Sequence, residues 1–168
     1  MKLLIIRHAI AASPEDFAKK SKDDAQRPLT KVGRRRMRRA AKAIRDLMPN
    51  LNVLATSPLV RAVQTGEILE HAYEGLSALQ IAPLSPRKPV TALLHWLQQQ
   101  PADATIALVG HEPQLGIFAS WMMTGLQEPF LTLKKGGACL LEIDGEVRAG
   151  RAKLIWLLKS SQLRKLGR

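Results

Sequence analysis

Short apolar runs alternate with longer amphipathic segments along most of this chain, and this alternation constrains the fold more than any other feature. Short continuous apolar runs are typical of strands buried on both faces of a sheet, and apolar residues at steps of three and four indicate helices. The expected strands are Lys2–Ile6, Val53–Thr56, Leu79–Ala82 and Thr105–Val109, and the expected helices run from Thr30 to about Met48, from Pro58 to about Tyr73, from Val90 to Gln99 and from Pro113 to about Thr124. This order predicts an α/β fold with three layers, α/β/α, around a mostly parallel sheet.

The last part of the chain departs from the alternation. Ala138–Ile143 and Ala152–Leu158 both have the character of strands, and the loop between them contains Asp144-Gly145. This predicts an antiparallel pair at the edge of the sheet. Because the chain has 168 residues, 46% of them hydrophobic, it can bury one sizeable core, and we expect a single domain over residues 1–168.

Several classes of protein are excluded by what the sequence lacks. Cys139 is the only cysteine, so the chain is no disulfide scaffold. The apolar run after Lys2 ends at Arg7, which is too soon for an export signal or a membrane span. We therefore expect a soluble, cytoplasmic protein that does not bind a membrane. The four histidines lack the spacing of metal ligands, so we expect no metal site.

The net charge of +12 is concentrated in two segments. Lys31–Met48 contributes +7 and Glu146–Arg168 contributes +6, so that the rest of the chain is close to neutral. Two basic surfaces favour anionic partners, although both can equally be solvated faces. We do not expect nucleic acid as a partner, because the sequence has no nucleic-acid motif and only 4% aromatic residues.

Charged and imidazole side chains follow three of the expected strands at the end where ligands bind in such folds. Arg7 and His8 follow the first strand, Arg61 lies one turn into the helix after Ser57-Pro58, and His111 ends the strand from Thr105. A guanidinium buried without an anion is strongly disfavoured, and its planar donors match phosphate oxygens. Neutral imidazole has a lone pair that can attack phosphorus. These residues therefore predict phosphoryl transfer through a phosphohistidine intermediate.

Structural interpretations of the same residues remain open. A histidine at the end of a strand is often structural, and Arg61 can pair with Glu67 on its own helix. Gly110 can serve only to permit a tight turn.

Four segments resemble the motifs of a known family. Ile6–Ala9, Ser57–Thr65 and Gly110–Pro113 resemble the three motifs of the histidine phosphatase superfamily, and Arg27–Gly33 is similar to a segment of its short, single-domain phosphohistidine phosphatases of the SixA type. The resemblance implies a phosphoglycerate mutase-like fold and no cofactor. It also implies His8 as nucleophile, Arg7, Arg61 and His111 around the phosphoryl group, and Arg27 as a further phosphate ligand.

The chain departs from the family pattern in two places. Ala9 stands where many members have glycine after the nucleophile. The second departure is the missing general acid. The segment between Arg61 and His111 has four acidic residues, and none is expected near the carboxyl ends of the strands: Glu67, Glu70, Glu74 and Asp103. Glu112 is the remaining candidate acid, although it equally suits the first turn of a helix.

An enzyme without a general acid favours P–N bonds over P–O bonds, because a protonated imidazole leaves readily whereas an alkoxide needs a proton donor. The leading hypothesis is thus a phosphohistidine phosphatase that acts on a phosphorylated protein in signal transduction, for example a histidine-containing phosphotransfer domain. One alternative is a phosphatase of broad specificity for small molecules. The other is a polyanion-binding module with a degenerate site.

Overall fold

The computed structural model describes residues 1–21 and 23–167, and its centre is a six-stranded mixed sheet in the order β3-β2-β4-β1-β5-β6. The strands are β1 (Lys2–Arg7), β2 (Val53–Thr56), β3 (Ala78–Gln80), β4 (Thr105–Gly110), β5 (Ala138–Ile143) and β6 (Ala152–Leu158). The first four run parallel to one another, and β5 and β6 add an antiparallel edge beside β1. The carboxyl ends of β2, β4 and β1 are therefore neighbours at one end of the sheet.

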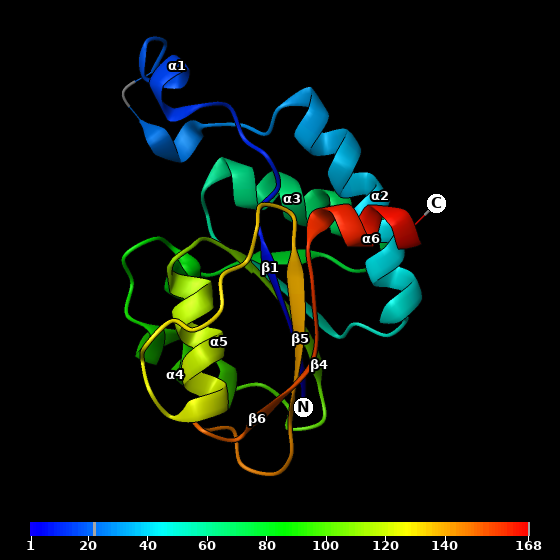
Figure 1. Ribbon diagram of the computed structural model, residues 1–168, viewed down its shortest axis with the longest axis vertical. Helices are drawn as coiled ribbons and strands as arrows, with labels where there is room; N and C mark the ends of the chain where they lie inside the picture. Colours follow the sequence, from blue (N-terminus) through cyan, green and yellow to red (C-terminus); the bar gives the residue numbers. More distant parts are fainter. Residues whose placement is uncertain (22, 168) are drawn as a thin grey trace.

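Helices cover both faces of this sheet (Figure 1). They are α1 (Pro14–Ala18), α2 (Lys31–Leu47), α3 (Val60–Ala72), α4 (Val90–Gln98), α5 (Gln114–Thr124) and α6 (Ser160–Leu166), with short 3₁₀ turns η1 (Asp24–Gln26) and η2 (Ala82–Leu84). Side chains alternate across β1: Leu3 and Ile5 pack with α4 and α5, whereas Leu4 and Ile6 pack with α2, α3 and α6. The sheet is therefore the middle of the three layers that the sequence predicts.

Helix α2 shows how the sequence positions one of these layers. Thr30 begins the helix, with its hydroxyl accepting from the Gly33 N–H at 2.9 Å. Met37 and Ile44 are buried on its inner face, and the basic residues lie outside. Val32 and Leu47 also fit the apolar period of this helix, but each is more than 40% exposed.

Most predicted elements are confirmed, and the differences have local causes. Strand β3 is Ala78–Gln80 rather than Leu79–Ala82, because the 3₁₀ turn η2 already begins at Ala82, with Pro83 in its first turn. Helix α3 begins at Val60, two residues after Pro58, since Leu59 still has extended backbone. The four elements that the sequence did not predict are all short: α1, η1, η2 and α6. Within the described residues, no helix is long and apolar enough to cross a membrane.

Candidate active site

His8 and His111 meet at the carboxyl ends of β1 and β4. The two strands pair in parallel up to Arg7 and Gly110, and the His8 N–H then donates to the Gly110 carbonyl at 3.0 Å. Both rings are buried, with 5% and 4% of each residue exposed. Their centroids are 5.1 Å apart and the ring planes are tilted by 54°. The structure thus brings the two histidines of the sequence prediction into one site.

The hydrogen bond of His8 defines which ring nitrogen can react. Its Nδ1 lies 2.7 Å from the carbonyl oxygen of Ala9. A carbonyl only accepts, so Nδ1 carries the hydrogen and Nε2 keeps its lone pair. Burial lowers the pKa of His8 to about 4, against the smaller opposing effect of the Ala9 bond, and the charges of Arg61, Arg7 and Arg27 lower it further. His8 is therefore a neutral imidazole with a free nucleophilic nitrogen at neutral pH.

His111 is held by Ser57, which follows β2. The His111 Nε2 lies 2.8 Å from the Ser57 hydroxyl oxygen, and that oxygen accepts from the Leu59 N–H at 3.3 Å. If the hydroxyl donates its own proton to Nε2, then Nδ1 carries a hydrogen, and this buried Nδ1 has no partner. Burial, followed by the charges of His8, Arg61 and Arg7, lowers the pKa of His111 to about 3. In this tautomer His111 has a free donor beside His8.

Two arginines complete the site and keep unused donors. The Nη1 of Arg7 donates to the Leu133 carbonyl at 2.8 Å, and the Nη1 of Arg61 donates to the Asp24 carbonyl at 2.9 Å. The Nε atoms of both arginines are buried without a hydrogen-bond partner. A buried cationic donor without a partner is costly, so this arrangement suits an oxyanion.

Asp24 joins two of the phosphate-ligand candidates, and sequence reasoning missed it. Its carboxylate accepts from Arg27 Nε at 2.7 Å and pairs with Arg61 Nη1 at 3.1 Å. Arg61 therefore pairs with Asp24 and not with Glu67. Partial burial raises the pKa of Asp24, but the hydrogen bond from Arg27 and the charges of Arg61 and Arg27 outweigh it and hold the pKa below its usual value. Asp24 is ionised and orients both guanidinium groups.

Several motif residues hold the backbone around the site in place. Thr65 on α3 accepts from the Ala9 N–H at 3.1 Å, and Gln64 accepts from the Leu29 N–H at 2.9 Å. Gly33 is needed because a Cβ there would lie 2.0 Å from the Ile10 carbonyl oxygen. Among the described residues other than glycine, only Arg87 has a positive φ, so alanine after His8 introduces no backbone strain.

Comparison with known proteins agrees with this geometry. The family model of the histidine phosphatase superfamily (branch 1) matches residues 3–84. An uncharacterized protein of Picosynechococcus sp. is 40% identical over 139 residues, which is 82% of each chain. The chain belongs to the histidine phosphatase superfamily.

Solved structures share the fold over nearly the whole chain. The structure of the protein histidine phosphatase SixA complexed with tungstate matches with a TM-score of 0.82 at 23% identity, covering 97% of this chain and 99% of that one. A protein provisionally assigned as phosphohistidine phosphatase SixA, from Nakamurella multipartitia, matches with a TM-score of 0.75 at 24% identity over 94% of each chain. The phosphoglycerate mutase-like α/β/α fold that the sequence predicts is confirmed.

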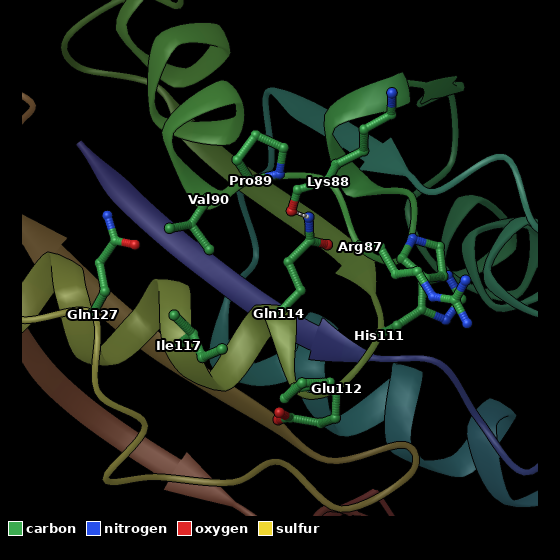
Figure 2. Close-up of a pocket in the computed structure, with 11 residues that line it drawn as sticks. Arg87, Lys88, Pro89, Val90, His111, Glu112, Gln114, Ile117 and Gln127 are labelled. Carbon is green, nitrogen blue, oxygen red and sulfur yellow. Dashed lines mark hydrogen bonds between the residues drawn. The ribbon is translucent and has the colours of Figure 1, made fainter.

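Glu112, the acid candidate of the superfamily motif that contains His111, faces backbone amides. One carboxylate oxygen accepts from the Leu133 N–H at 2.7 Å and the other from the Gly116 N–H at 3.3 Å. Figure 2 shows its carboxylate pointing away from His111. Burial raises the pKa of Glu112, and the two backbone hydrogen bonds oppose this rise. This geometry joins the start of α5 to the loop before β5 and does not aim a proton at the histidine pair.

A cavity of about 430 Å³ opens beside His111. Its walls come from the connection between η2 and α4, which includes Arg87 and Lys88, and from Gln114 and Ile117 on α5 (Figure 2). The Gln114 amide nitrogen donates to the Pro83 and Lys88 carbonyls at 2.8 and 2.9 Å, whereas its oxygen is buried without a partner. The cavity thus offers one acceptor next to the histidine pair, and Arg87 is part of its lining.

Proposed function

We propose that this protein is a phosphohistidine phosphatase that removes the phosphoryl group from a histidine side chain of another protein. The observation that carries the proposal is the state of Asp24. Its carboxylate contacts Arg27 and Arg61, and these two arginines hold it ionised. Glu112 uses both oxygens on backbone amides. Neither group is arranged to protonate an alkoxide, so the site suits a leaving group that needs no carboxylic acid.

The reaction begins with attack by His8. Its Nε2 lone pair forms a bond to phosphorus while the P–N bond to the substrate imidazole breaks, and the bonding pair leaves with that imidazole, whose ring is protonated by solvent. Arg7, Arg61 and the Nδ1–H of His111 stabilise the charge on the phosphoryl oxygens. By analogy with arginine fingers, this stabilisation supplies roughly 10³ to 10⁵ in rate, or about 4 to 7 kcal/mol. Water then hydrolyses the P–N bond to His8, which releases phosphate and restores the neutral ring.

The cavity beside His111 fits the departing side chain. An imidazole that leaves the phosphorus atom carries a ring N–H, and the Gln114 oxygen is a buried acceptor without a partner in this cavity. The cavity is open enough for a histidine presented on a protein surface. A phosphorylated histidine-containing phosphotransfer domain has this form of substrate, and the basic outer face of α2 favours an acidic partner of this kind.

Rapid quench with a ³²P-labelled phosphohistidine protein tests the proposal. The wild type should form an acid-labile, base-stable phosphoenzyme, which His8→Ala should lack. His95→Ala is the matched control, because His95 lies on α4 and is exposed. If His8→Ala turns over the substrate at the wild-type rate, the assignment of His8 as nucleophile is refuted.

Small phosphorylated metabolites are the second candidate substrates, and one observation favours them. Arg87 lines the cavity beside His111, where its guanidinium suits a carboxylate or a second phosphate on a small molecule. The two candidates differ in kcat/KM. A value for sugar phosphates or similar esters that equals or exceeds the value for a phosphohistidine protein would favour the small molecules.

A further inference from the structure

Helix α2 has two basic flanks, and they have different surroundings. On the flank towards α3, Arg34 and Arg38 border a hollow that also contains Glu67. On the other flank, α6 packs against α2 (Figure 1), with Leu163 fully buried. The two helices come so close that a Cβ on Gly167 would lie 2.2 Å from the Arg39 carbonyl oxygen. The second flank of α2 is therefore partly covered by α6.

A hollow of about 270 Å³ lies between these two helices, and arginine side chains form its lining. Arg35, Arg36 and Arg39 come from α2 and Arg164 comes from α6. Among the described residues, none of the four takes part in an ion pair. Arg164 donates to the Ser160 hydroxyl at 2.9 Å, which neutralises no charge. Partial burial, and then the charges of Arg36 and Arg39, lower the pKa of Arg164.

Four guanidinium groups around one small space repel one another, so the folded protein bears an electrostatic cost at this place. The same arrangement is favourable when an anion enters, because guanidinium donors match phosphate oxygens in pairs. Charge density decides which anion fits best. A space of this size admits one or two carboxylates of an acidic peptide, whereas a linear triphosphate brings about four negative charges in one compact group.

We propose that the hollow between α2 and α6 binds a linear polyphosphate, either as inorganic tripolyphosphate or as the triphosphate of a nucleotide. The site shares no residue with the phosphate ligands around His8. It lies near them in the fold, because Ser160 at the start of α6 is close to Gly136, whose N–H donates to the carbonyls of Arg7 and His8. The proposal concerns binding and is independent of the reaction that the catalytic site performs.

Isothermal titration of the full chain carrying His8→Ala tests the proposal without turnover of the ligand. Inorganic tripolyphosphate and ATP are titrated separately at about 0.15 M ionic strength, where long-range attraction is screened. One molecule should bind per chain with a Kd well below roughly 1 mM. The tighter of the two ligands identifies the carrier of the triphosphate.

Two pairs of substitutions on this background separate a built site from general attraction. Arg36→Gln with Arg39→Gln should weaken binding about 30-fold or more, because two charge-assisted contacts are lost. Arg38→Gln with Lys42→Gln removes the same charge from the other flank and should weaken it less than about threefold. Equal weakening by the two pairs, or no saturable binding to either ligand, would overturn the proposal.

A third variant excludes binding in the catalytic site. Arg61→Gln removes a phosphate ligand beside His8 and should leave the Kd of tripolyphosphate unchanged within about twofold. Orthophosphate is the matched small anion and should bind at least about tenfold more weakly than tripolyphosphate, because it engages fewer guanidinium groups. Loss of tripolyphosphate binding in Arg61→Gln, or equal affinity for the two anions, would place the anion in the catalytic site and overturn the proposal.

Discussion

The buried histidine pair makes the stability of the fold depend on pH in a predictable direction. Burial first, with nearby positive charge, lowers the pKa of His8 to about 4 and that of His111 to about 3, from 6.5. The unfolded chain therefore binds protons below about pH 6.5 that the folded chain rejects. The folded state is stabilised fully above this pH, and stability is lost as the pH falls towards the folded pKa values. Between about pH 7.5 and 5.5 each ring accounts for about 1 kcal/mol, and the pair for about 2 to 3 kcal/mol.

Urea unfolding at these two pH values measures the effect. The wild type should lose about 1 kcal/mol more stability than His8→Ala over this interval, because the variant retains only the contribution of His111. Common contributions from other titrating groups cancel in the comparison. His95→Ala is the control and should follow the wild type. If His8→Ala loses as much stability as the wild type, the His8 ring is not held neutral by the fold and the reasoning is refuted.

Three further substitutions test individual contacts. Asp24→Asn removes the charge that orients Arg27 and Arg61, so kcat for a phosphohistidine substrate should fall about 10- to 100-fold. An unchanged kcat in steady-state assays would contradict the orienting role. Gly33→Ala places a Cβ against the Ile10 carbonyl and should lower stability by about 1 to 3 kcal/mol, which a thermal melt would show as a lower Tm. Glu112→Gln keeps one acceptor for two backbone amides and should cost about 1 to 2 kcal/mol of stability in urea, with less than a threefold change in kcat; a much larger fall in kcat would identify Glu112 as a proton donor.

The strand ends of this fold are predictable from sequence because they follow from local patterns. Apolar runs locate β1, β2 and β4, and parallel pairing then places their carboxyl ends side by side. His8 and His111 come together for this reason alone. The role of a neighbouring motif residue such as Thr65 cannot be predicted from sequence, because its hydroxyl accepts a hydrogen bond from the backbone of Ala9, far away in the chain.

Contacts made by short irregular segments cannot be predicted from such local patterns. Asp24 lies in the 3₁₀ turn η1, and its pairing with Arg61 spans 37 residues. The one local signal is its position three residues before Arg27, a spacing at which opposite charges pair in a helical turn. Helix α6 has seven residues, too few for a clear period, so the sequence showed two basic segments without showing that α6 joins one to the other.

The state of Asp24 also predicts how reactivity depends on the leaving group. An enzyme that protonates its leaving group gives rates that vary little with the leaving-group pKa, whereas one without a proton donor gives a steep dependence. Because Arg27 and Arg61 hold Asp24 ionised, aryl phosphates should be cleaved at rates that fall steeply as the pKa of the phenol rises. A series of substituted phenyl phosphates measures this through kcat/KM. A flat dependence would show that a general acid operates at this site, and the preference for P–N bonds would then lose its physical basis.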